Sequence, residues 1–109
     1  MAKHDFGIMT TAPRPGVRYD EYEPQKYNCI SVDDDYVEIL DGKSLDVPVF
    51  YHTLDYPAHG LNYCGITLIP PLSAIMLAGI IGDDNSLQQL KTLLETAGRE
   101  NKFIIHYGI

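Results

Sequence analysis

Residues 61–80, Leu-Asn-Tyr-Cys-Gly-Ile-Thr-Leu-Ile-Pro-Pro-Leu-Ser-Ala-Ile-Met-Leu-Ala-Gly-Ile, change their hydrophobic period at the two prolines in the middle. Before the prolines the run is strand-like and rich in β-branched residues, which is typical of a buried strand. After them, apolar residues recur at helical spacing up to Ile80, with Ser73 as a natural N-cap and Leu72 placed to pack on Leu77. The stretch therefore predicts a strand followed directly by a short, very apolar helix.

A second helix and a last strand follow. Ser86 and Gln89 have the spacing of a capping box, and Gly98 suits the position just after a helix. Between them, apolar residues recur on one side: Leu87, Leu90, Leu93, Leu94 and Ala97. Residues 102–109 then alternate between apolar and other side chains, which predicts a strand with one apolar face.

The amino-terminal half reads as strands joined by turns. Residues 4–9 predict a short strand. Residues 27–32 and 36–40 predict a hairpin whose turn is formed by the three aspartates at 33–35. Residues 45–53 predict a third strand in sequence. This half is therefore expected to be all strand and loop.

An irregular Pro/Tyr-rich loop is expected at about residues 10–26, where three prolines and a glycine interrupt any period. Tyr19, Tyr22 and Tyr27 punctuate this region. Their apolar rings and polar tips suit either packing of the loop onto the protein body or presentation of a surface to a partner. Packing is the favoured interpretation, because exposed aromatic side chains more often pack locally.

The order of elements predicts one α+β domain over residues 1–109. We expect a mostly antiparallel sheet of about five to six strands, two C-terminal-half helices on one face and a final C-terminal strand. If the strands at 61–69 and 102–109 are neighbours, the helical pair is a crossover between parallel strands and the sheet is mixed. The other sheet face is then open, or covered by the 10–26 loop or by a second subunit, which makes a homodimer an expected alternative to a monomer.

The net charge of −7 comes from one region of the chain. Residues 19–41 hold eight acids against one base, Lys26, and the rest of the sequence is balanced. The scattered bases argue against nucleic acid as a partner, since a phosphate backbone requires clustered lysine and arginine. A basic protein is the partner that the acidic region favours.

The sequence carries no membrane or secretion signal. Its longest apolar stretch, residues 68–81, contains two prolines and is shorter than the roughly 20 residues that span a bilayer. The amino terminus lacks the apolar segment of a secretory signal. We therefore expect a cytoplasmic protein that does not bind membranes.

Residues 51–64 form the candidate site for chemistry, because they bring two histidines and three tyrosines into one connection between apolar runs. His52, Asp55, His59 and Tyr63 are the candidate catalytic residues, as a histidine held by Asp55 could act as acid or base beside a tyrosine. A zinc site would need Cys64 or His106 as a further ligand and matches no recurring pattern, so neither a metal nor a cofactor is expected.

The remaining titratable residues carry less information. His4 lies near the terminus, and His106 lies opposite the apolar face of the last strand. Cys29 and Cys64 both lie in apolar runs typical of buried free thiols, and only Cys64 has histidines close in sequence that could activate it.

Two functions remain open. The preferred one is a protein-binding or regulatory module, of the kind that antitoxins and immunity proteins represent, which engages a basic partner. Its candidate partner-binding residues lie at the start of the acidic region: Tyr19, Asp20, Glu21, Tyr22 and Glu23. The alternative is a small enzyme or small-ligand-binding protein with its site in residues 51–64.

Overall fold

The computed structural model describes residues 2–109, which fold into six strands and three α-helices. The strands are β1 (Lys3–Ile8), β2 (Ile30–Asp33), β3 (Pro48–Tyr51), β4 (Pro57–His59), β5 (Ile66–Ile69) and β6 (Ile104–Tyr107). The helices are α1 (Asp34–Lys43), α2 (Pro71–Ile81) and α3 (Gln88–Arg99), with two short 3₁₀ helices, η1 (Pro24–Tyr27) and η2 (Asn85–Leu87). This arrangement confirms the predicted α+β class.

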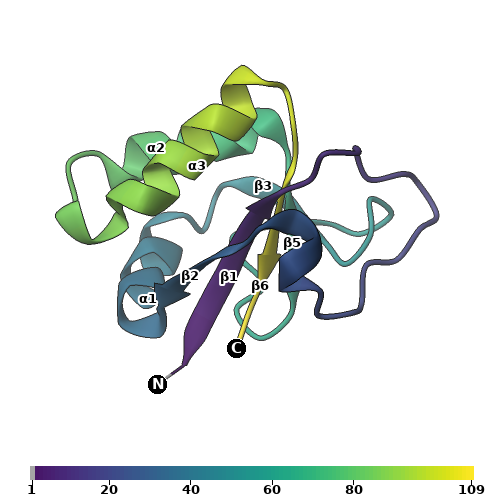
Figure 1. Cartoon of the computed structure of the whole chain (residues 1–109), viewed down its shortest axis with the longest axis horizontal. Helices are drawn as coiled ribbons and strands as arrows, with labels where there is room; N and C mark the ends of the chain where they lie inside the picture. The colour runs from purple at the N-terminus through teal and green to yellow at the C-terminus, as the bar shows by residue number, and fades with distance from the viewer. Residues whose placement is uncertain (1) are drawn as a thin grey trace.

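All six strands belong to one sheet with the order β2-β1-β6-β5-β3-β4. Every neighbouring pair is antiparallel, and the first and last strands, β1 and β6, are neighbours in the interior of the sheet. The expected parallel pairing of the strands before and after the helices is wrong: β5 and β6 are neighbours, but Thr67 pairs with His106 in an antiparallel register. Two helices of similar length lie side by side between them (Figure 1), so the chain returns to the end of the sheet that it left.

The hairpin predicted for residues 27–40 is also wrong in its second half, because residues 34–43 form α1. Asp33 is the N-cap of this helix, and its carboxylate accepts a hydrogen bond from the Asp35 N–H at 3.1 Å. Asp34 and Asp35 lie in the first turn, where the helix dipole favours negative charge. Val37 and Leu40, one turn apart, are buried in the core.

The capping residues predicted for the later helices differ in the structure. Pro70 is the N-cap of α2, and Ser73 lies inside the helix, where its hydroxyl donates to the Pro48 carbonyl. Asp84, rather than Ser86, supplies the side chain that caps η2 before α3 begins. Gly98 lies within α3, so its role is packing and not termination.

The sheet separates two apolar clusters. The larger cluster lies between the sheet and all three helices, and its members include Phe6, Val37, Leu77 and Leu94. The smaller cluster lies on the outer face, around Ile66, Leu68 and Ile105. Side chains from the segment between β1 and β2 pack over it: Tyr19, Tyr27 and Cys29.

The loop therefore covers the outer face of the sheet, one of the expected alternatives. Gly7 on β1 allows this cover, since a Cβ there would lie 2.7 Å from the Tyr27 carbonyl oxygen and from the Cys29 sulfur. Figure 1 shows the loop leaving β1 at one end of the longest axis, with α1 at the other. Within residues 2–109, no helix combines the length and apolar character needed to cross a membrane.

Two helical glycines give a matched test of the helical layer. A Cβ at Gly98 would lie 2.4 Å from Ile75 Cγ1 of α2, whereas a Cβ at Gly79 would have nothing within 4 Å. We expect Gly98→Ala to lower the free energy of unfolding by about 1–3 kcal/mol through overpacking. Gly79→Ala should raise it by about 0.5–1 kcal/mol by removing the helix penalty of glycine. Urea unfolding of both variants measures the difference; a Gly98→Ala protein as stable as wild type would contradict the close α2–α3 contact.

Candidate functional site

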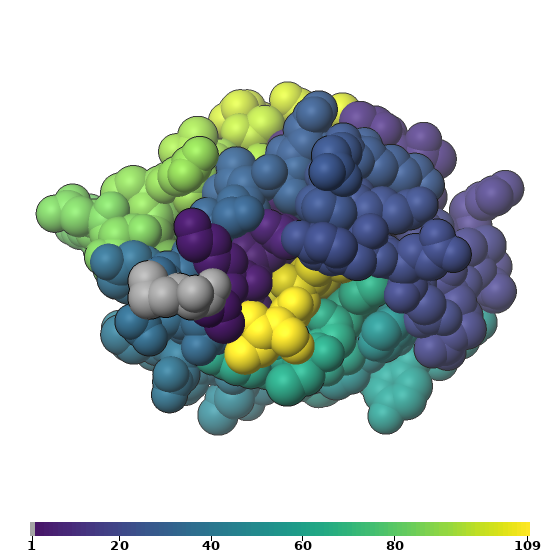
Figure 2. Space-filling model, turned by 60° about the horizontal axis from the view of Figure 1, so that its bottom comes forward, coloured from purple at the N-terminus to yellow at the C-terminus, as the bar shows by residue number. Residues whose placement is uncertain are grey.

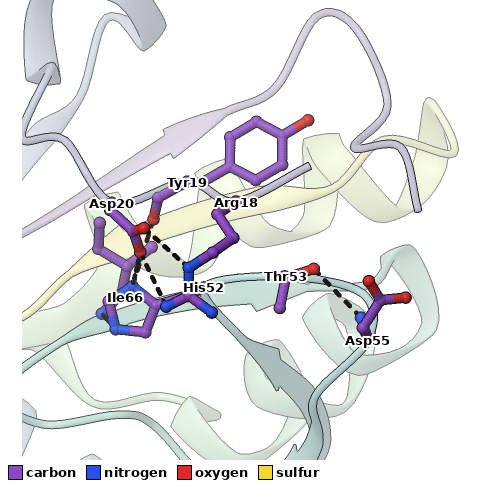
Figure 3. Close-up of polar contacts among 7 residues, drawn as sticks. All are labelled: Arg18, Tyr19, Asp20, His52, Thr53, Asp55 and Ile66. Atoms are coloured by element: carbon purple, nitrogen blue, oxygen red, sulfur yellow. Dashed lines mark hydrogen bonds and ion pairs between the residues drawn. The ribbon is translucent and has the colours of Figure 1, made fainter. Parts of the chain in front are cut away.

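His52 follows β3 directly and adopts a left-handed backbone conformation, with φ of 62°. Its Nδ1 lies 2.8 Å from a carboxylate oxygen of Asp20, in the loop that covers the outer face. Arg18 grips the same carboxylate through two donors at 2.9 and 3.2 Å, and this contact chiefly lowers the pKa of Asp20 (Figure 3). His52 Nδ1 also lies 3.3 Å from the Tyr19 carbonyl, which can only accept, so in the neutral ring the proton is on Nδ1 and the lone pair is on Nε2, to which the Ile66 N–H donates at 3.5 Å.

Asp55 has a different task. Its carboxylate accepts a hydrogen bond from the Gly16 N–H at 3.1 Å, and its own N–H donates to the Thr53 hydroxyl at 3.3 Å. The Tyr19 N–H also donates to the His52 carbonyl at 2.8 Å. Figure 3 shows Asp55 across the turn from the His52 ring, so Asp55 anchors the loop and does not orient the imidazole.

The other two predicted catalytic residues also lie apart from His52. His59 is exposed on β4 at the edge of the sheet, and Tyr63 donates its hydroxyl to Asp34 at the start of α1. The pocket that contains His52, of about 300 Å³, is lined by Asp20, Tyr22 and Cys64 among others, but not by Asp55, His59 or Tyr63. The structure therefore pairs His52 with Asp20 and does not bring the four predicted residues into one site.

A row of hydrogen-bonded polar side chains crosses three neighbouring strands on the inner face of the sheet. Asp34 Oδ1 lies 2.9 Å from His4 Nε2, and His4 Nδ1 lies 2.9 Å from His106 Nε2. His106 Nδ1 lies 2.9 Å from the Thr67 hydroxyl, which accepts a hydrogen bond from the Asn62 N–H at 2.8 Å. His4, His106 and Thr67 are each 0 % exposed and come from the neighbouring strands β1, β6 and β5.

The two ends of this row fix the direction of its hydrogen bonds. Asp34 can only accept and the Asn62 amide can only donate. With both rings neutral, Thr67 donates to His106, His106 donates to His4, and His4 donates to Asp34. Every polar atom in the row then has a partner without any ring gaining a proton, which agrees with the absence of unsatisfied buried side-chain atoms among residues 2–109.

Burial sets the electrostatics of the row. The pKa of His106 is lowered to about 3 by desolvation and then by the neighbouring His4. The hydrogen bond from Tyr63 chiefly lowers the pKa of Asp34, with His4 contributing next. The Tyr63 ring also lies edge-on to His4, with ring centres 4.8 Å apart, and so covers the row from the loop side. The row is closed to substrates along its middle, and at one end the Asp34 side chain is 23 % exposed.

His4 carries little information in the sequence, near the terminus as it is, but in the structure it lies between Asp34 and His106 in this network. One signal could have identified it. His4, Thr67 and His106 each lie two residues from a core residue of the same strand, Phe6, Ile69 and Ile104, and so share the helix-facing side of the sheet. Polar residues at buried positions of neighbouring strands require partners, and they are natural partners for one another.

In the first part of the acidic region, residues 19–23, most of the predicted partner-binding side chains contact other residues of the protein. Tyr19 packs on the outer face, Asp20 is paired with Arg18 and His52, and Glu23 lies 3.7 Å from Lys26. Tyr22 donates its hydroxyl to Asp5 at 2.5 Å while two thirds of its surface remains exposed. Glu21 is exposed at the surface.

The cysteines are free thiols in different surroundings. Cys29 is partly buried, and desolvation raises its pKa to about 12, whereas Cys64 is exposed, unlike the buried thiol expected. No group of three or more histidine, cysteine, aspartate or glutamate side chains within residues 2–109 is arranged to hold a metal ion.

The buried row predicts a specific acid sensitivity. The pKa of His106 is about 3 in the folded protein and about 6.5 in an unfolded chain. Between these values the unfolded state binds more protons, so the free energy of unfolding should fall as pH drops from about 6.5 toward 3. In His106→Gln, which keeps one donor and one acceptor, this fall should be smaller, whereas His59→Gln should behave as wild type. Thermal unfolding across pH 3–7 measures it; equal slopes in all three proteins would contradict it.

Comparisons with known proteins add no functional assignment. The chain matches no protein-family model, no curated protein and no solved structure. Its function is therefore inferred from the geometry of its own residues.

Proposed function

We propose that this protein is a protein-binding module that docks a basic partner on the solvent face of α1. The observation that carries the proposal is the pairing of exposed apolar and acidic side chains on this helix. Tyr36 is 44 % exposed and Ile39 is 55 % exposed, and the exposed acids Asp35 and Glu38 lie beside them. An exposed aromatic ring among carboxylates keeps apolar surface in contact with water, and such surface rimmed by polar groups is typical of a protein-binding site.

The charge of this face is free to act on a partner. Neither Asp35 nor Glu38 forms an ion pair within residues 2–109, in contrast to Asp20 and Glu23 of the loop. Unpaired carboxylates speed encounter with a basic surface, and the apolar side chains between them supply contact area once the partner has docked. This moves the proposed docking face from residues 19–23 to the second half of the acidic region.

A small acidic protein that covers a basic surface would act by occupancy. Antitoxins and immunity proteins work in this way, and the proposal assigns the chain to the same broad class of regulatory binders. Leu45, 63 % exposed just beyond α1, extends the apolar part of the face. The structured helix also reduces the entropy lost on binding, because α1 is already formed and capped.

A charge-matched pair of double variants tests the docking face. Asp35→Asn with Glu38→Gln removes two charges from α1, and Asp83→Asn with Glu95→Gln removes two exposed charges elsewhere. We expect the first pair to reduce capture of the basic partner from lysate at least about fivefold at low salt, and the second pair to leave it nearly unchanged. Quantitative mass spectrometry of the captured proteins measures both. Equal losses would show that overall charge, and not α1, controls binding.

A homodimer stays a prediction. Its natural place is the solvent face of α2, where Leu72, Ile75 and Met76 are 77 %, 50 % and 45 % exposed. No charged residue occurs in α2, so two copies could approach there without the repulsion expected between their acidic regions.

A second candidate function is thiol chemistry at Cys64. This exposed thiol lines the same pocket of about 300 Å³ as His52 and Asp20. His52 Nδ1 lies 2.8 Å from Asp20 and 3.3 Å from the Tyr19 carbonyl, so the proton of the neutral ring is on Nδ1 and Nε2 is the basic atom, the arrangement in which a histidine can take a thiol proton. Figure 2 shows the end of the chain, in yellow, between the dark-blue loop segment that precedes β2 and the teal segment of the middle of the chain.

Alkylation kinetics test the thiol candidate. We expect iodoacetamide to modify Cys64 several-fold more slowly in His52→Asn than in wild type at pH 7, because the thiol would lose the base that takes its proton. Asparagine tolerates the left-handed backbone at this position. Cys29, whose pKa is raised to about 12 by burial, is an internal reference for slow modification in the same sample. Equal Cys64 rates in the two proteins would remove His52 from any role there.

A further inference from the structure

A hollow of about 390 Å³ lies between the loop and the end of β1, far from α1. Met9, Val17, Tyr19 and Tyr27 form much of its wall, and Thr10 and Thr11 add hydroxyl groups. Arg14 and Lys26 also line it, and no acidic residue does. In a protein with a net charge of −7, this hollow is a local site of positive charge on an apolar and aromatic surface.

The loop that forms the hollow is held in one conformation by several contacts. Residues 14–17 form a turn in which the Val17 N–H donates to the Arg14 carbonyl at 3.2 Å. Pro15 and Gly16, with φ of 80° at the glycine, occupy the central positions where a type II turn requires them. The Met9 N–H donates to the Phe103 carbonyl at 2.9 Å, which fixes the other side. The hollow is therefore formed before any ligand arrives.

An adjoining hollow of about 350 Å³ shows why the sign of charge matters. The two share Val17, Tyr19, Lys26 and Tyr27, but the second is also lined by three acids, Asp20, Glu21 and Glu23, against one further base, Arg18. An anion would be repelled from the second hollow and attracted to the first. Lys26 stays charged, since Tyr27 and then Glu23 raise its pKa. Its pair with Glu23 is loose, at 3.7 Å between exposed groups, and so competes weakly with a ligand.

We propose that the first hollow binds a small organic anion with an aromatic or branched apolar body. The anionic group would lie toward Arg14 and Lys26, and the body would pack against Met9, Val17 and Tyr27. The volume is at the lower end of the range for small-molecule sites, so the ligand is the size of a substituted benzene ring rather than a nucleotide. This site is separate from α1, so its test and the test of the docking face are independent.

Four probes of similar shape and different charge test the site. Benzoate and phenyl phosphate carry negative charge, benzamide is neutral, and benzylamine is positive. We expect benzoate or phenyl phosphate to shift the backbone amide signals of Tyr27 and of the non-proline residues in 9–17 saturably in a two-dimensional NMR titration. Benzamide should bind about tenfold more weakly, and benzylamine should not bind, because the hollow has no carboxylate.

Matched variants complete the test. Lys26→Met and Arg14→Gln should each weaken binding of the anionic probe about tenfold, while Lys43→Met, at the end of α1, removes the same charge and should leave affinity within about twofold. The dispersed spectrum of each variant reports that it is folded. The proposal is overturned if neither anion saturates by about 10 mM, if benzamide binds as tightly as the anions, or if Lys43→Met loses as much affinity as Lys26→Met.

Discussion

The fold depends on burying two imidazole rings and a hydroxyl without leaving any of their polar atoms unpaired. Each unpaired polar group in this core would cost about 1–3 kcal/mol. The row from Asp34 to Thr67 avoids that cost only if β1, β6 and β5 keep their register, because a one-residue shift of β6 would turn His106 to the outer face. The row also requires Asp34 at the start of α1 and Asn62 in the loop between β4 and β5. One network thus fixes three strands, a helix and a loop relative to one another.

The two faces of the sheet serve different purposes. The inner face is closed by three helices and holds the buried row, while the outer face is covered by a loop tied down through Gly16, Tyr19 and Asp55. Three pockets are lined by residues of this loop, on the outer face of the sheet. α1 carries the carboxylates of Asp35 and Glu38 without ion pairs among residues 2–109, and one hollow of the loop is lined by Arg14 and Lys26. A protein of this size can in this way offer two surfaces of opposite sign.

Much of the fold could be predicted because the apolar period is strong where packing is strong, as in α2, α3 and β6. The region after β2 misled the prediction, since aspartates favour turns and helix N-termini alike. Burial of Val37 and Leu40 against the sheet favours the helix over a turn and a strand, and this burial is a tertiary contact that local sequence does not show. The site was harder still: His4 is 30 residues from Asp34 and 102 from His106, so no local spacing announces their contact. His52 was identified, but its partner Asp20 lies in a loop whose path a sequence does not reveal.

The central pairing of β1 with β6 has a consequence for how the chain folds. Asp5 pairs with Tyr107, so the middle of the sheet closes only when segments at opposite ends of the polypeptide meet. Such a contact is of high sequence separation, which is typical of slow-folding topologies. During synthesis one edge of β1 can pair with β2, and His4 can reach Asp34, but the other edge of β1 and His4 Nδ1 have no partner until β6 has left the ribosome. That edge of β1 therefore stays open to mispairing and to chaperones while residues 34–103 are synthesised.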